Sequence, residues 1–309
     1  MTQSETAPFA GAEIDRVMGF VIPARHARGR VARLGPVLDT ILSAHGYPPA
    51  IEAVLAEALV LTALLGATLK DDAGQLTVQA QTSGGAIDLM VCDYKGGAMR
   101  GYLRHDPEAL AALPDAPTIR DLFGEGYLAI TFDQAVSGER YQGIVPLEGA
   151  CLAEAVESYF AQSEQIPSLA RVAVGRDGEG RRVAGGLLVQ HLPEGEEGRD
   201  RIHTRLDHPE WEGVRALAIT IAGDELTDAH LPLETILWRL FNEEEVRLLS
   251  ETDLARGCRC SPEHVRDVIE RFPAAERAEM AGDDGLIRID CQFCSRVFAL
   301  DPAELGGDA

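Results

Sequence analysis

The sequence lacks the features that mark a membrane or secreted protein. Met1–Ala10 is polar and acidic, without the basic and apolar regions of a secretory signal, so we expect no signal there. The longest apolar run, Ala58–Leu69, is too short to span a bilayer. The single asparagine, Asn242, precedes two glutamates and forms no glycosylation sequon. We therefore expect a cytoplasmic protein without a membrane partner.

Basic residues are scarce. The 309-residue chain has 28 lysines and arginines against 50 acidic residues, a formal net charge of −22. A surface of this sign repels phosphate backbones, so we expect no general nucleic-acid binding. The motifs G-x-G-x-x-G, G-x-S-x-G and the P-loop are also absent from the sequence, and nothing indicates nucleotide chemistry or a serine hydrolase. We predict that the protein is not an enzyme.

Six cysteines are present, and four of them lie in the last fifth of the chain. Cys258 and Cys260 form C-x-C, and Cys291 and Cys294 form C-x-x-C. In a reducing compartment such pairs are more often metal ligands or redox switches than permanent disulfides. The other two, Cys92 and Cys151, lie in apolar segments and are interpreted as core residues.

Two short cysteine pairs suit a zinc site. Zinc prefers four soft ligands in a tetrahedron, and each pair presents two sulfurs from one tight turn. Ser261–Asp290 is long enough to fold as a helical excursion that returns the second pair to the first. We predict one Zn²⁺ per chain. Two unrelated buried cysteine pairs, or His264 as a substitute ligand, remain alternatives. The ligands would be the four side chains of Cys258, Cys260, Cys291 and Cys294.

The cysteine-bearing tail, residues 251–309, has few residues with which to build a core. Metal binding would therefore supply much of its folding free energy, on the order of 10 kcal/mol in small zinc peptides. Two short helices and one strand are predicted here, over Pro262–Arg271, Ala274–Ala281 and Leu286–Ile289. The expected apolar core consists of Val265, Val268, Ile269, Phe272, Ile287, Ile289 and Phe298.

The remaining pattern indicates an α+β protein: an antiparallel-sheet-plus-helices domain over residues 1–192, a helical linker over 193–250, and the tail. Apolar spacing predicts helical structure from Gly29 to Leu69, broken at Pro48-Pro49, and another helix over Leu147–Phe160. Strands are predicted near residues 75–81, 86–92, 98–104, 170–174 and 182–190. The linker begins at a charged segment, residues 193–198, and contains predicted amphipathic helices over Trp211–Ala222 and Leu233–Phe241.

Several segments resemble the redox-regulated 33 kDa chaperonin (heat shock protein 33) family. The tail carries Cys258-Arg259-Cys260-Ser261, a thirty-residue gap, and Cys291-Gln292-Phe293-Cys294. Four further segments resemble the family in the same order: Ala56–Lys70, Arg100–Arg104, Tyr141–Val145 and Glu157–Gln165. The resemblance extends over nearly the whole chain.

The resemblance implies a chaperone that holds unfolding proteins under oxidative stress. In the reduced form of such proteins, four thiolates hold zinc and activity is low. Oxidation forms two short disulfides, here Cys258–Cys260 and Cys291–Cys294, and releases the metal. The tail and linker then unfold, and the protein binds unfolded clients, as a monomer when reduced and often as a homodimer when oxidised.

The linker helices offer a client surface in this scheme. Their large apolar side chains need a folded neighbour, and the metal-dependent tail is the expected cover. A permanent core between domains is the alternative interpretation. The candidate client-binding residues are Trp211, Leu217, Ile219, Leu237, Trp238 and Phe241.

Two other function classes are open at this stage. Cys291 and Cys294 could form the active site of a thiol–disulfide oxidoreductase, although a strand and turn, rather than a thioredoxin-like βαβ unit, surround them. The tail could also be a zinc-ribbon nucleic-acid module. Residues 251–309 hold 7 arginines, no lysine and 13 acidic residues, without the basic face that phosphate contacts require.

Overall fold

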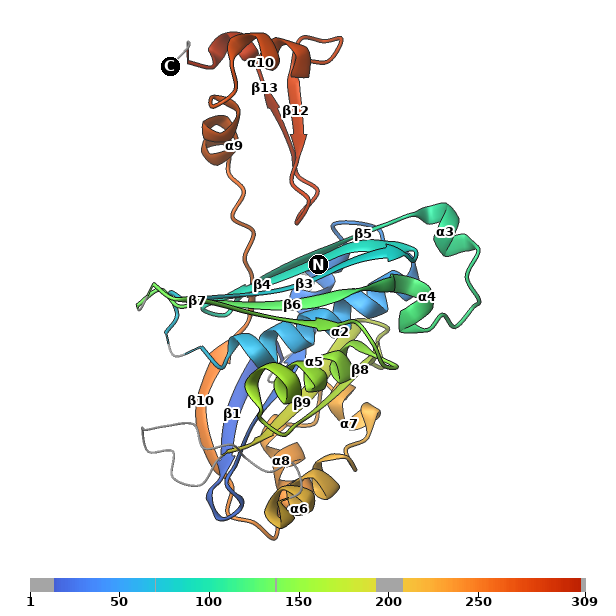
Figure 1. Cartoon of the computed structure of the whole chain (residues 1–309), viewed down its shortest axis with the longest axis vertical. Helices are drawn as coiled ribbons and strands as arrows, with labels where there is room; N and C mark the ends of the chain where they lie inside the picture. Colours follow the sequence, from blue (N-terminus) through green and yellow to red (C-terminus); the bar gives the residue numbers. More distant parts are fainter. Residues whose placement is uncertain (1–13, 70, 137, 193–207, 307–309) are drawn as a thin grey trace, which may run out of the picture.

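The computed structural model describes residues 14–69, 71–136, 138–192 and 208–306. It contains two large β-sheets with a long helix between them, and a small separate tail (Figure 1). The tail projects at one end of the molecule, while α6 (Pro209–Ala218) and α8 (Leu233–Phe241) lie at the other. The predicted mixture of helices and sheets is confirmed. The predicted linker start, residues 193–198, lies outside the described residues.

The first sheet has five antiparallel strands in the order β10-β1-β2-β9-β8. Its edge strand β10 comes late in the chain and pairs with β1, so the segment after α8 becomes part of this sheet. Predicted strands over residues 170–174 and 182–190 lie within β8 and β9. The bounds are β1 Arg16–Ile22, β2 Ala27–Leu34, β8 Ser168–Arg176, β9 Arg182–His191 and β10 Arg247–Asp253.

The second sheet has six strands in the order β11-β5-β4-β3-β6-β7. The short strand β11 pairs with β5 in parallel, and the other neighbours pair antiparallel. The predicted strands over residues 75–81, 86–92 and 98–104 correspond to β3, β4 and β5. The bounds are β3 Gln75–Gly84, β4 Ile87–Lys95, β5 Ala98–His105, β6 Gly124–Asp133, β7 Arg140–Pro146 and β11 Ala255–Arg256.

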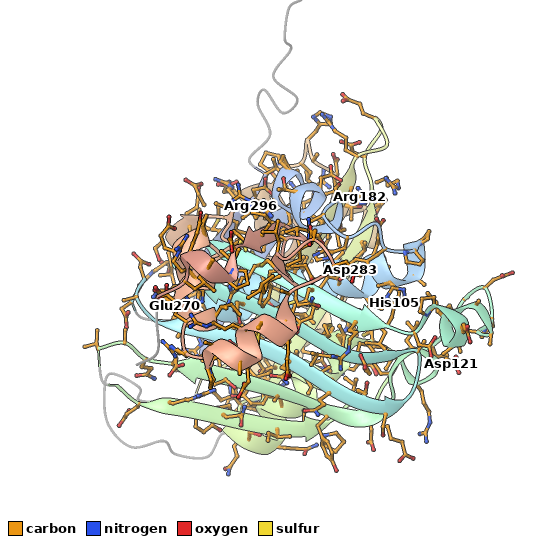
Figure 2. The ribbon with its side chains drawn as sticks, turned by 90° about the horizontal axis from the view of Figure 1, so that it is seen from above. His105, Asp121, Arg182, Glu270, Asp283 and Arg296 are labelled. Atoms are coloured by element: carbon orange, nitrogen blue, oxygen red, sulfur yellow. The ribbon has the colours of Figure 1, made fainter. Side chains whose placement is uncertain are left out.

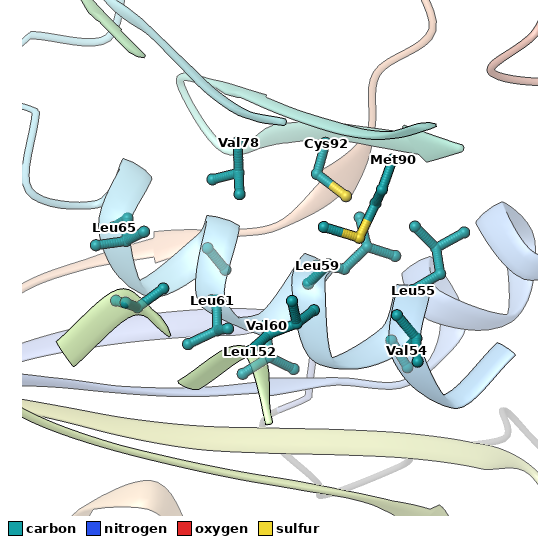
Figure 3. Close-up of a cluster of buried hydrophobic side chains, with 14 of the residues drawn as sticks. Val54, Leu55, Leu59, Val60, Leu61, Leu65, Val78, Met90, Cys92 and Leu152 are labelled. Atoms are coloured by element: carbon teal, nitrogen blue, oxygen red, sulfur yellow. The ribbon is translucent and has the colours of Figure 1, made fainter. Parts of the chain in front are cut away.

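Helix α2 (Pro49–Gly66) lies between the two sheets and forms the main core with α5 (Figure 3). Leu59 and Cys92 are fully buried in this layer, which confirms Cys92 as a core residue. α2 is long and apolar enough to cross a membrane by length and composition, but 72% of it is buried inside the fold. We therefore interpret it as the core helix. The other helices before the tail are α1 Pro36–Leu42, α3 Pro107–Ala111, α4 Ile119–Phe123, α5 Leu152–Tyr159 and α7 Gly223–Thr227.

The predicted helical structure at Gly29–Leu34 is wrong, because these residues belong to β2. Val31 and Leu34 are both buried, but in different clusters on opposite faces of the first sheet. A strand covered on both faces loses the alternation that normally distinguishes it, and its apolar residues then mimic a helical spacing. The helix predicted from Leu147 starts later, at Leu152.

Helices α6, α7 and α8 cover the outer face of the first sheet. Trp211, Leu237 and Phe241 are buried there together with Phe20 of β1 and Val189 of β9. Within the described residues, this cluster contains no side chain from the tail. The expectation that the tail covers the linker helices is therefore wrong. The first sheet is buried on both faces, and its outer face, rather than the tail, covers the linker helices.

The tail packs α9 (Pro262–Ile269) and α10 (Ala274–Met280) beside a two-stranded sheet of β12 (Ile287–Asp290) and β13 (Val297–Leu300). Short helical turns over Pro23–Arg25, Phe160–Glu164 and Pro302–Glu304 complete the described elements. The buried core of the tail is small, as expected, but its membership differs from the prediction. It consists of Val265, Ile269, Ile287, Phe298, Leu300 and Leu305.

Candidate metal centre

The two cysteine pairs come from different local structures. Cys258 and Cys260 follow β11 in an extended segment that ends at the first residue of α9. Cys291 and Cys294 lie in the tight turn between β12 and β13. The carbonyl of Cys291 closes this turn by accepting hydrogen bonds from the N–H groups of Cys294 and Ser295, at 3.1 and 2.7 Å. Ser295 has a left-handed backbone with φ of 54°, which reverses the chain into β13.

The fold brings the four sulfur atoms together. The Sγ atom of Cys258 lies 3.2 Å from that of Cys260 and 3.6 Å from that of Cys291, and Cys260 Sγ lies 3.4 Å from Cys294 Sγ. All four sulfurs lie within 4.8 Å of one another. A tetrahedral zinc site with Zn–S bonds of 2.3 Å has sulfur–sulfur edges of about 3.8 Å. The four free thiols therefore form a cluster that could hold a metal ion.

The thiols of the cluster differ in how readily they ionise. Burial opposes ionisation of Cys258, but hydrogen bonds from the backbone of Cys260 and from neighbouring thiols lower its pKa to about 7. The pKa of Cys260 is raised by burial and by its hydrogen bonds to the neighbouring thiols, with the charge of Cys258 adding to the effect. Four negative sulfurs this close repel one another strongly. A divalent cation in their midst would remove this repulsion.

Helix α9 holds the first pair in place. The Ser261 side chain accepts a hydrogen bond from the N–H of His264 at 3.1 Å and caps the helix immediately after Cys260. Val265, one turn further on, is buried in the tail core. His264 itself lies outside the group of possible ligands. The alternative in which His264 replaces a cysteine therefore has no geometric support.

The turn between the second pair docks onto the outer face of the second sheet. The ring of Phe293, within the C-x-x-C segment, meets Tyr102 of β5 edge to face, with centroids 4.9 Å apart. The guanidinium of Arg100 lies 3.9 Å above the same ring. Arg100 is itself held by a salt bridge to Asp93 of β4 at 2.6 Å. The C-x-x-C turn is thus packed against β5, and Asp93 of β4 holds Arg100 in place beside it.

Two polar contacts also join the tail to the main fold, in addition to the contact of the Phe293 ring. Ser295 Oγ lies 3.2 Å from Nδ1 of His45, which follows α1, and the Arg259 guanidinium donates to the side-chain oxygen of Gln75 at 2.6 Å. Viewed from above, the tail overlies part of the second sheet, and Asp121 on α4 lies away from it (Figure 2). Both cysteine pairs therefore have a neighbour that contacts the sheet.

Replacing Phe293 with leucine is expected to weaken docking of the tail without removing any of the four cysteines. The aromatic and cation contacts it loses are worth about 1–2 kcal/mol together, or about tenfold in the docking equilibrium. Amide exchange in β5 should rise, measured by mass spectrometry on the zinc-loaded protein. Unchanged exchange in β5, at unchanged zinc content, would contradict the docking role. Phe298→Leu, which changes a ring in the tail core instead, is the matched control.

The six candidate client-binding residues fall into two groups. Trp211, Leu237 and Phe241 are buried against the first sheet. The other three lie on the surface, with Trp238 66%, Ile219 45% and Leu217 39% exposed. The helices thus bury one apolar face and present a second, partial one to solvent.

The C-x-x-C segment differs from the arrangement of a thiol–disulfide oxidoreductase. In such a motif the first cysteine opens a helix, whose N-terminal N–H groups stabilise its thiolate. Here Cys291 and Cys294 occupy a turn between two strands. The surroundings of the pair favour metal ligation.

Sequence reasoning missed the residues that connect the tail to the rest of the chain. Arg100 and Tyr102 belong to a segment that resembles the chaperonin family, but nothing in their spacing pointed to Phe293. Arg33 is fully buried at the first sheet and also gave no signal, because an arginine inside an apolar strand has no characteristic pattern. Long-range contacts of this kind are set by the fold.

Comparison with known proteins gives one consistent result. The sequence profile of the family described as Hsp33 protein matches residues 15–301. The 33 kDa chaperonin of Caulobacter vibrioides is 42% identical over 306 residues, covering 97% of this chain and 99% of its own length. The 33 kDa chaperonin of Shigella boydii is 36% identical over 285 residues, covering 91% of each chain.

A solved structure shares the fold. The crystal structure of the 33 kDa chaperonin from Thermotoga maritima superposes with a TM-score of 0.75 at 21% sequence identity. The match covers 94% of this chain and 96% of that one.

Proposed function

Because the chain belongs to the Hsp33 family, whose members are chaperones rather than enzymes, we propose that it is a holdase switched on by oxidation. The observation that carries the proposal is the four-cysteine cluster, which lies at the junction between the tail and the second sheet. In the reduced state the cluster holds the tail together. Disulfide formation removes the ligands and releases the structure that depends on them.

The donor set fits zinc. Four cysteine sulfurs that all lie within 4.8 Å of one another suit a tetrahedral thiolate site, and such a site is closed to substrate. Cys258, Cys260, Cys291 and Cys294 would hold one Zn²⁺, which would offset part of their negative charge and cross-link the two cysteine pairs. The reducing cytoplasm, where we propose the protein works, keeps these thiols free.

Oxidation closes each pair on itself in this proposal. The pairing Cys258–Cys260 and Cys291–Cys294 is supported by the resemblance to the family and by the short separation within each pair along the chain. The sulfur–sulfur distances alone do not select it, because Cys260 and Cys294 lie about as close as Cys258 and Cys260. A disulfide-bonded sulfur is no longer a thiolate ligand, so metal loss follows.

The chain itself connects the cluster to the linker helices. Gly257, next to Cys258, donates its N–H to the carbonyl of Met99 at 2.7 Å, and a Cβ at Gly257 would lie 2.5 Å from the Ala98 side chain. β11 thus runs closely along β5, and β10 and α8 precede it directly. When Cys258 no longer binds the metal, the segment that contains β10 and β11 loses its attachment at that end. Strands β11 and β10, which have few buried side chains, are then free to separate.

Loss of β10 and the linker helices would uncover apolar surface for clients. Trp211, Leu237 and Phe241 would join the already exposed Trp238 and Ile219 in one apolar surface. Unfolded proteins are the expected partners, because a chaperone binds exposed apolar segments. We propose that the reduced protein is a monomer and that the oxidised protein pairs through the same uncovered surface.

The proposal is tested by measuring zinc release and chaperone activity in one sample. Hypochlorous acid, or peroxide with mild heat, is expected to release one zinc per chain and to switch on suppression of aggregation of a denatured client. Equal suppression by the reduced and oxidised protein would refute the switch. Insulin reduction is measured in parallel, since turnover there would favour the oxidoreductase alternative.

Replacing Trp238 with serine is expected to reduce client binding by the oxidised protein several-fold, while the stability of the reduced protein changes by less than about 0.5 kcal/mol. The side chain is 66% exposed, so it contributes little to packing. Binding is measured by fluorescence anisotropy of a labelled unfolded client, and stability by urea titration. Val136→Ser, at a remote side chain that is 85% exposed, is the control. Unaltered binding by W238S would remove Trp238 from the client surface.

A further inference from the structure

A groove of about 450 Å³ lies between the tail and the second sheet, beside the cysteine cluster. Its lining is mostly aliphatic and aromatic. It also includes one cysteine from each pair, Cys260 and Cys291, and two arginines, Arg100 of β5 and Arg259 of the C-x-C segment. The volume lies in the range of small-molecule sites.

The apolar wall of this groove is left open by the fold of the tail. Val268 and Phe272 were expected in the tail core, but they are 39% and 37% exposed and line the groove instead. Val265 and Ile269, which lie with Val268 on α9, are buried in the tail core and also line the groove. A tail with so few buried apolar residues leaves two of its large ones outside, facing the metal ligands.

We propose that this groove binds the apolar part of an organic hydroperoxide and delivers its peroxy group to the cysteine cluster. The inference rests on the proposed oxidative switch and names the class of oxidant that the switch recognises. The chemistry of the lining selects this occupant. The aliphatic and aromatic side chains of the groove bind the alkyl or aryl group of the hydroperoxide. Cys260 and Cys291 are the groups that react, and Arg259 attracts the peroxide oxygen that becomes negative.

The reaction balances within each cysteine pair. The Cys291 thiolate attacks the terminal oxygen of R–O–O–H, the O–O bond breaks, and R–O⁻ leaves and takes a proton from water to give the alcohol. Cys291 is now a sulfenic acid. The Cys294 thiolate attacks its sulfur, the disulfide forms, and hydroxide leaves. Cys260 and Cys258 react in the same way with a second molecule. Each hydroperoxide is reduced by two electrons, and each pair is oxidised by two.

The test compares two oxidants on the reduced, zinc-loaded full-length protein. Zinc release is followed with a chromophoric chelator and thiol loss by alkylation, with cumene hydroperoxide or hydrogen peroxide at equal concentration. We expect cumene hydroperoxide to react about tenfold faster, because its ring is buried on binding and the smaller oxidant gains nothing from the groove. The redox-inert cumyl alcohol should slow only the cumene hydroperoxide reaction.

Substitutions in the wall separate binding from reactivity. Phe272→Ser and Val268→Thr are expected to lower the preference for cumene hydroperoxide several-fold and to leave the hydrogen peroxide rate unchanged. Met280→Ser, at an exposed side chain of α10 outside the groove, should behave as the parent protein. Both wall residues are partly exposed, and zinc content before oxidation verifies that each variant is folded.

The outcomes distinguish this inference from the proposed function. Equal rates for the two oxidants, or a preference unchanged in both wall variants, would overturn the groove as a hydroperoxide site while leaving the switch intact. Failure of both oxidants and of hypochlorous acid to form disulfides would overturn the switch itself.

Discussion

Removal of zinc from the reduced protein is expected to unfold residues 258–306 while the core around α2 remains folded. The tail buries only six apolar side chains in its own core, too few to offset the chain entropy of a segment this long. Zinc binding contributes on the order of 10 kcal/mol in peptides of comparable size. Hydrogen exchange should show loss of protection in β12, β13 and α9 after chelation, and retained protection in α2.

The same result is expected from Cys291→Ser, which removes one of the four sulfurs. The matched control is Cys151→Ser, because Cys151 is half-buried and lies outside the cluster. It should keep one zinc per chain and a protected tail. Full protection of β12 and β13 in the metal-free protein would contradict the dependence of the tail on zinc. It would also remove the physical basis of the proposed switch.

Replacing Arg33 with methionine is expected to release α7 and α8 without oxidation. Arg33 on β2 is 1% exposed and donates three hydrogen bonds to backbone carbonyls, those of Glu225, Leu226 and Leu231. Two of these carbonyls belong to the last turn of α7, where no helix partner exists. Burial lowers the pKa of Arg33 to about 10, so it remains charged at neutral pH.

The packing of residues 225–231 against β2 is expected to be weakened by about 3–5 kcal/mol, because three buried carbonyls lose a charged hydrogen-bond donor. The apolar cluster around Trp211 and Phe241 should then open in the reduced protein. Amide exchange in α8 and binding of a hydrophobic dye report this directly, and aggregation suppression without oxidant is the functional measurement. Aggregation suppression by the zinc-loaded variant would show that release of the linker helices is enough for activity and does not require loss of the metal.

The control for this prediction is Arg104→Met. Arg104 is an exposed arginine on β5 whose partner Asp88 is also exposed, and an exposed ion pair of this kind contributes little to stability. Arg33→Lys tests the geometry, since one ammonium cannot replace a guanidinium that reaches three carbonyls. If α8 exchanged at the same rate in R33M as in the parent protein, the anchoring role of Arg33 would be wrong.

The gathering of the four cysteines followed from local spacing. C-x-C and C-x-x-C each keep two cysteines within a few residues of each other, and a pair of strands with a capped helix brings the two pairs together. Three of the six strands of the second sheet, β3, β4 and β5, were also predictable. Along β3, for example, Leu76, Val78 and Ala80 alternate with polar residues, whose face of the strand is not part of the core. These features depend on residues close together in the chain.

The cover of the linker helices was not predictable from the sequence. The apolar faces of α6 and α8 indicate that something covers them, but not which surface does so. The first sheet covers them because β10 returns to pair with β1 and closes the segment against it. The same burial on both faces made β2 resemble a helix. Val268 and Phe272 were predicted to lie in the tail core but are exposed, because apolar spacing alone does not show which side of a thin tail faces solvent.

The sequence by itself therefore determined the two cysteine pairs that could hold a metal ion, the acidic charge and the core helix, because each depends on residue type and short spacing. Only the tertiary structure decided what the cluster touches. Phe293 packs under Arg100, Arg33 binds the end of α7, and a groove forms beside two of the sulfurs. These contacts join residues separated by up to about two hundred positions, and their partners are chosen by the packing of whole sheets and helices.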